Sequence, residues 1–123
     1  MRIAVAALAL LALAGCGGSS TPSAYARENT ALLDRVPVDP RAAAPRTTSA
    51  ANSKTEFAAR DWTLPAGTDA ETVITWYVRR LHKRRWLIVG KNAGTIRAVR
   101  GPASLSIGVR ARTLEVIANA RGR

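Results

Sequence analysis

The sequence predicts a small α+β domain of two layers, in which one amphipathic helix packs on an antiparallel meander of about four strands. A helix-start pattern precedes a stripe of apolar residues that recur at three- and four-residue steps over residues 70–81. Four short segments with strand character follow over residues 86–120. Short turns join these segments, and strands joined by short turns pair antiparallel. One helix against one apolar sheet face makes two layers.

Residues 1–15 have the composition of a secretion signal. Met1-Arg2 gives a positive start, and residues 3–14 form an unbroken apolar run. This run is shorter than the roughly 20 apolar residues that a membrane-spanning helix needs, and it fits the centre of a signal peptide. It ends in Leu13-Ala14-Gly15-Cys16, which resembles the bacterial lipobox. The resemblance implies that Cys16 becomes the lipid-bearing first residue of the mature protein, anchored by acyl chains such as palmitate.

The position of Cys16 also explains why an exported chain has a single cysteine, which cannot form an internal disulfide. The alternatives are a plain signal peptide with a chance cysteine, or a membrane-spanning anchor, which the short run disfavours. The expected location is the bacterial cell envelope, on the outer face of the cell membrane. In a cell with two membranes it is the outer membrane, because Gly17 stands where the inner-membrane retention signal has aspartate.

Residues 16–50 are predicted to be a lipidated and mostly flexible tether. The stretch 17–23 has the Gly/Ser/Pro composition of a spacer. Residues 29–36 are a candidate short helix that Pro37 ends, with Leu32 and Leu33 available for docking. Residues 51–123 are predicted to form the domain.

The domain begins with a candidate extra strand over residues 56–64, followed by the turn Pro65-Ala66-Gly67. Thr68-Asp69-Ala70-Glu71 matches a capping box, in which the Thr68 hydroxyl and the Glu71 side chain cap each other's backbone amides. The helix is expected over about residues 69–84. Four strands are expected after it: residues 86–89, 95–100, 104–110 and 113–120.

This order resembles small exported bacterial domains of unknown function, in which an amphipathic helix leads through Gly-Trp into an antiparallel sheet. Trp76-Tyr77 in the helix and Trp86 at the corner carry the resemblance, which spans roughly residues 55–120. The chain departs from the pattern at Arg85, where glycine is usual, and a left-handed helix cap disfavours a side chain there. The resemblance implies a fold and no activity.

Charge points to an anionic partner. The chain carries +11 overall, and residues 66–123 hold twelve cations against three acids. Such a field attracts phosphates, anionic lipids, acidic polymers and acidic proteins. Arginine outnumbers lysine sixteen to three, a bias that a GC-rich genome also produces. Nucleic acid is not expected as the partner of a lipid-anchored exported domain.

Catalytic and metal-binding constellations are missing from the sequence. No Gly-x-Ser-x-Gly motif occurs, and His82 is the single histidine, on the expected exposed side of the helix. One histidine with scattered carboxylates is not a metal-ligand set. The segment 90–95 has the letters of a phosphate loop in the wrong order, and a hairpin turn explains it better. We therefore expect no enzyme, no cofactor and no metal.

One basic surface remains as the candidate site. At 100° per residue, Trp76 shares the polar side of the helix with cations, and an aromatic among cations suits lipid headgroups or an anionic partner. The predicted surface residues are Trp76, Arg79, Arg80, Lys83 and Arg84. Alternatively, the preceding segment covers Trp76 and the cations are only solvated.

The hypothesis is thus a non-enzymatic binding or accessory module that contacts an anionic polymer, lipid headgroups or an acidic protein. A structural subunit or spacer of an envelope complex is the second hypothesis. A third, an unrecognised enzyme, would need Asp61, His82 and Glu115 together in one pocket.

Overall fold

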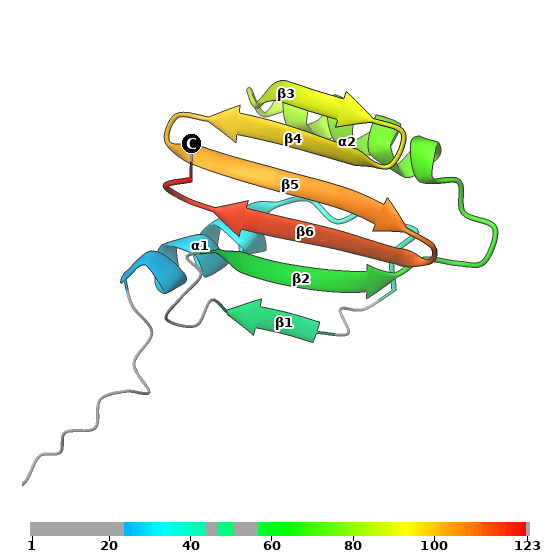
Figure 1. Cartoon of the computed structure of the whole chain (residues 1–123), viewed down its shortest axis with the longest axis horizontal. Helices are drawn as coiled ribbons and strands as arrows, with labels where there is room; N and C mark the ends of the chain where they lie inside the picture. Colours follow the sequence, from blue (N-terminus) through cyan, green and yellow to red (C-terminus); the bar gives the residue numbers. More distant parts are fainter. Residues whose placement is uncertain (1–23, 44–46, 51–56, 123) are drawn as a thin grey trace, which may run out of the picture.

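The computed structural model describes residues 24–43, 47–50 and 57–122, and it confirms the predicted two-layer α+β domain (Figure 1). Two helices lie on one face of a six-stranded sheet. The elements in chain order are α1 (Ala24–Arg35), β1 (Thr47–Ala50), β2 (Ala58–Thr63), α2 (Ala70–Lys83), β3 (Leu87–Asn92), β4 (Thr95–Arg100), β5 (Ala103–Arg110) and β6 (Thr113–Asn119).

The sheet has the strand order β1-β2-β6-β5-β4-β3, and all neighbouring strands are antiparallel. The four-stranded meander is therefore the predicted one, and β2 is the extra strand before the helix. β1 was not predicted, and its residues pair with those of β2, from Thr47 opposite Asp61 to Ala50 opposite Ala58. A bulge between Ile88 and Gly90 interrupts the edge pairing of β3 with β4.

Burial follows the alternation of the strands. In β5 and β6, one side of each strand enters the core while the residues between face away from the helices. Helix α1 packs on β6 and β2, and α2 packs on β5, β4 and β3. Each helix thus covers one half of the sheet, and Figure 1 shows both on the same side.

Helix α1 corrects the expectation of a flexible tether with a short helix. It begins at Ala24, not near residue 29. Leu32 and Leu33 dock into the shared core, as expected. The first half of its buried stripe consists of Ala26 and Asn29. Neither residue is strongly hydrophobic, so the sequence pattern did not reveal this part of the helix. The Asn29 side-chain oxygen accepts a hydrogen bond of 2.7 Å from the backbone N–H of Ala120, beyond β6. This segment is thus part of the folded unit.

Helix α2 has nearly the predicted bounds, but the predicted capping box is wrong. Asp69 is the N-cap, with no side-chain capping bond. The Thr68 hydroxyl instead donates to the carbonyl of Pro65 at 2.7 Å and so belongs to the preceding turn. The helix start is stabilised by acidic residues at its positive end, Asp69 and Glu71.

The C-terminal end of α2 forms a Schellman motif with arginine in the position that favours glycine. The amide of Trp86 donates to the carbonyl of Leu81, and the amide of Arg85 donates to that of His82, both at 3.0 Å. Arg85 has a φ of 68°, in the left-handed region. The turn between α2 and β3 therefore keeps the geometry of a glycine cap, and the next residue, Trp86, is buried in the core.

We expect Arg85→Gly to stabilise the domain by about 1 kcal/mol, because glycine adopts the left-handed conformation without the steric cost of a side chain. Urea denaturation of both chains measures the difference. His82→Gly, inside the helix, is the matched control and should destabilise by about 1 kcal/mol. An Arg85→Gly chain less stable than the parent would show that the arginine side chain is itself stabilising.

Candidate functional site

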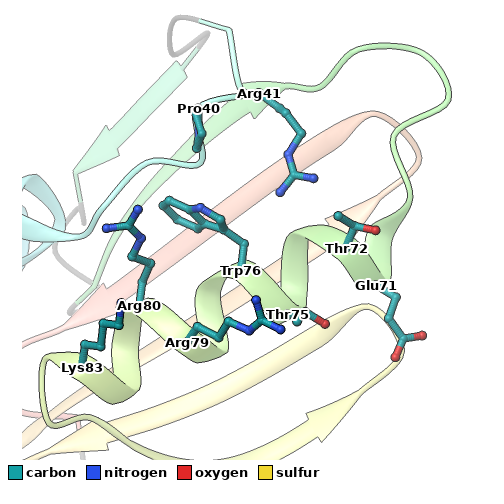
Figure 2. A pocket seen from close by; sticks show the side chains of 9 residues that line it. All are labelled: Pro40, Arg41, Glu71, Thr72, Thr75, Trp76, Arg79, Arg80 and Lys83. Carbon is teal, nitrogen blue, oxygen red and sulfur yellow. The ribbon is translucent and has the colours of Figure 1, made fainter.

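Four of the five predicted surface residues line one groove beside α2. Its volume is about 660 Å³. Figure 2 shows the groove between α2 and the connector that follows α1, with Pro40 and Arg41 on the connector side. The lining residues from the helix are Glu71, Thr72, Thr75, Trp76, Arg79, Arg80 and Lys83.

Helical periodicity places these side chains together. Thr72, Trp76, Arg79 and Lys83 recur at three- and four-residue steps, so they share one face of the helix. The opposite face buries Val73, Ile74, Tyr77 and Leu81 against the sheet. The apolar stripe that fixes α2 on the sheet thereby also fixes the direction of the groove.

Trp76 is partly buried, whereas Trp62 and Trp86 lie within the core. The Arg80 guanidinium lies 5.0 Å from the centre of the Trp76 ring, within range of a cation–π interaction. The Tyr77 ring meets the same indole edge to face, with ring centres 4.9 Å apart. These contacts hold the indole inside the groove.

The groove is strongly basic. Arg79 and Lys83 have no hydrogen-bond or ion-pair partner in the part of the chain that the structure describes. Glu71 is the single acid among the lining residues. The groove can therefore hold anionic groups by charge and by hydrogen bonds from guanidinium and ammonium donors.

The connector is held to α2 at Asp39, whose carboxylate is buried and paired within the connector. The side chain of Asp39 has no exposed surface and accepts bonds from the Arg41 Nε at 2.9 Å and the Arg41 Nη2 at 2.7 Å. The backbone N–H of Asp39 donates to the Tyr77 hydroxyl at 3.2 Å. The chain thus crosses over α2 at a fixed place, and the Arg41 side chain is held at the groove wall.

The protonation states of this network follow from burial and pairing. Burial of Asp39 opposes its ionisation, but hydrogen bonds from the Arg41 side chain and backbone, and the charge of Arg41, outweigh it and lower the pKa. Burial raises the pKa of Tyr77 to about 12. At neutral pH the carboxylate is therefore ionised and the phenol neutral.

The structure places Arg84 apart from the other four predicted residues. Its Nη1 donates to the carbonyl of Arg35 at the end of α1, at 2.9 Å. The Arg100 Nη1 donates to the Arg84 carbonyl at 3.0 Å, and the Arg100 guanidinium lies 4.6 Å from the ring centre of Trp86. Arg84 lines a separate hollow of about 300 Å³ between the helix ends. Its side chain gives a carbonyl at the end of α1 the hydrogen-bond partner that the helix itself lacks there.

The three residues of the enzyme hypothesis do not meet in one pocket. Asp61 and Glu115 are directly opposite on β2 and β6. His82 is exposed on α2, which covers the other face of the sheet. Glu115 lines a hollow of about 510 Å³, together with Ser106, Thr95 and Thr113. Within the described residues, no group of three or more potential metal ligands occurs.

Cys16 lies outside the described residues, so the structure does not test its role. No helix in the described part of the chain combines the length and the apolar character needed to cross a membrane. No protein-family model, curated protein or solved structure matches the chain.

We expect Asp39→Asn to destabilise the fold by about 1–2 kcal/mol at neutral pH, because the Arg41 guanidinium loses its charged acceptor. The pKa of Asp39 is lowered on folding, so the ionised carboxylate stabilises fully above its ordinary pKa of 3.8. This contribution is lost as the pH falls through the lowered value. Urea denaturation from neutral into acid pH measures both effects.

The matched control is Asp34→Asn, whose exposed pair with Arg60 at 2.9 Å should contribute little. The stability difference between the Asp39→Asn chain and the parent should shrink at acid pH, because protonation of Asp39 removes the same interaction from the parent chain. A deficit that stays constant over the whole pH range would contradict the role given to the ionised carboxylate.

Proposed function

We propose that this chain is a lipid-anchored protein of the bacterial cell envelope and that its basic groove binds an anionic envelope component. The proposed partner is an anionic polymer, lipid headgroups or an acidic protein. The role is non-enzymatic binding, without cofactor or metal.

The observation that carries the binding proposal is the groove of Trp76, Arg79, Arg80 and Lys83. Arg60 pairs with Asp34, and Arg121 pairs with Glu28. Arg79 and Lys83 have no acidic partner among the described residues, as Lys91 and Arg97 also have none, but Arg79 and Lys83 line one groove together with Trp76. Mutual repulsion of neighbouring cations costs stability, and an anionic ligand would relieve it. An aromatic ring in the same groove adds contact area and a cation–π site.

The anchoring proposal is supported by the sequence. Leu13-Ala14-Gly15-Cys16 has the residue types of a lipobox and follows an apolar run of signal length. Several acyl chains make anchoring durable, since each buried methylene contributes about 0.8 kcal/mol.

A second candidate function is that of a structural subunit in an envelope complex. It is favoured by the edge strand β3, where Leu87 is 60% and Val89 is 50% exposed. An edge strand with exposed apolar side chains can pair with a strand of another protein. Such docking would persist at high salt, whereas groove binding of an anion would not.

The anchoring proposal predicts that the mature chain starts at a lipidated Cys16. Mass spectrometry of the protein extracted from its native membranes should give an N-terminal peptide with a diacylglyceryl cysteine. Cys16→Ser should release the chain from the membrane fraction. A mature chain with an unmodified Cys16 thiol, or one that still begins at Met1, would overturn the proposal.

The binding proposal predicts salt-sensitive co-sedimentation of the mature Cys16→Ser chain with envelope fragments. Arg79→Ala with Arg80→Ala should weaken binding about 30-fold, because each cation near an anionic surface contributes about 1 kcal/mol. The matched control is Lys91→Ala with Arg97→Ala, which removes two cations that do not line the groove. An equal loss of co-sedimentation in both double variants would show that net charge alone drives binding. Binding that persists in both variants at high salt would favour the second function.

A further inference from the structure

We propose that the hollow between the C-terminal ends of α1 and α2 is a second binding site, which takes a small amphipathic anion: one short aliphatic chain with a carboxylate or phosphate head. None of the described residues lines both this hollow and the groove beside α2, so the two sites are separate. The hollow combines an apolar floor, a mouth of arginines and a small volume.

The floor of the hollow is apolar. It is built from α1, α2, the residue that follows the end of α1, the residue that precedes β3, and β5. Its residues are each more than nine-tenths buried: Leu32, Val36, Leu81, Trp86 and Leu105. No hydroxyl, amide or carboxylate side chain occurs among the described residues that line the hollow. The floor therefore suits a hydrocarbon chain and has no side-chain acceptor for the hydroxyls of a polyol.

The mouth of the hollow carries three exposed arginines, and two of them are held in place by the fold. The Arg84 Nη1 donates to the Arg35 carbonyl at 2.9 Å, and the Arg100 Nη1 donates to the Arg84 carbonyl at 3.0 Å. The Arg100 guanidinium also lies 4.6 Å from the ring centre of Trp86. Each of these hydrogen bonds uses one of the five N–H groups of a guanidinium. The side chain of Arg35 has no partner within the described residues, so all its donors are available to a ligand.

The helix ends offset only part of the charge at this mouth. The C-terminal end of a helix has a partial charge of about −0.5, so the ends of α1 and α2 together balance about one of the three cations. The remaining positive charge lies directly beside the apolar floor. A carboxylate or phosphate head would neutralise it with paired hydrogen bonds from the guanidinium groups. An alcohol or an alkylammonium ion of the same length would lack this interaction.

The volume of the hollow limits the ligand to a single short chain. The hollow measures about 300 Å³, which is at the lower end of the range for ligand pockets. A phospholipid with two long chains exceeds this space. An inorganic anion would contact the arginines and leave the floor without a partner. The ligand that uses both parts of the site is therefore small, with one apolar chain and one anionic head.

Calorimetric titration of the mature Cys16→Ser chain with a series of carboxylates tests the proposal. The series runs from butanoate through hexanoate and octanoate to dodecanoate, each below the concentration at which it aggregates and at constant ionic strength. Octyl phosphate, octanol and octylammonium vary the head at constant chain length. We expect the affinity to rise about fourfold for each added methylene until the hollow is full, and then to level off. Octyl phosphate should bind about as tightly as octanoate, and octanol and octylammonium at least tenfold more weakly.

Two matched variants locate the ligand. Arg35→Gln should lower the octanoate affinity about tenfold, because it removes a charged donor at the mouth. Arg79→Gln removes one exposed cation from the groove beside α2 and should change the affinity little. Octanoate should shift the NMR methyl signals of Leu32 and Val36 and leave the Trp76 indole signal in place. Thermal unfolding without ligand checks that both variants are folded.

Every other pattern overturns the proposal. If octanol binds as tightly as octanoate, the arginines do not recognise the head. If butanoate binds as tightly as octanoate, the floor is not used, and an affinity that still rises at dodecanoate shows adsorption on the surface. If Arg79→Gln loses as much affinity as Arg35→Gln, or if the Trp76 signal shifts instead, the anion lies in the groove beside α2. The envelope co-sedimentation of the double variants tests the proposed function separately.

Discussion

The groove depends on a buried carboxylate. Asp39 has no exposed side-chain surface, and it keeps its charge because Arg41 surrounds it with hydrogen bonds. A buried ion that lost this partner would be costly, so this turn of the connector keeps its shape. The Tyr77 hydroxyl accepts a hydrogen bond from the Asp39 amide, which joins the connector to the centre of α2. The wall of the groove is thereby tied to α2.

The arginines of this domain divide into groups with different physical roles. Arg84 and Arg100 donate to carbonyls at the ends of α1 and α2, where helix ends leave acceptors without intrahelical partners. Arg121 joins the C-terminal segment to Glu28 of α1. Arg79 and Lys83 have no such bond in the described structure, and neither do Lys91 and Arg97. What sets Arg79 and Lys83 apart is their place along one groove of α2.

Local periodicity was enough to predict α2, the meander β3–β6 and four of the groove residues, because each depends on residues close in sequence. What it missed depends on tertiary contacts. The start of α1 carries its buried stripe on Ala26 and Asn29, and the side-chain oxygen of Asn29 is satisfied only by the distant amide of Ala120. Pro40 and Arg41 become a groove wall only when Asp39 is buried. Thr68 matched a cap by sequence, yet its hydroxyl is used by the preceding turn.

The arrangement of the helical layer bears on how an anchored chain would present its groove. α1 lies over β6 and β2, whereas α2 lies over β5, β4 and β3 (Figure 1). If Cys16 carries lipid as proposed, the chain leads from the bilayer into α1, on the half of the layer away from the groove. Tyr25 and Glu28 near the start of α1 both contact Arg121, which fixes this entry point relative to the sheet. The proposed anchor and the proposed anion site would then lie over different halves of the sheet, so that anchoring would leave the groove uncovered.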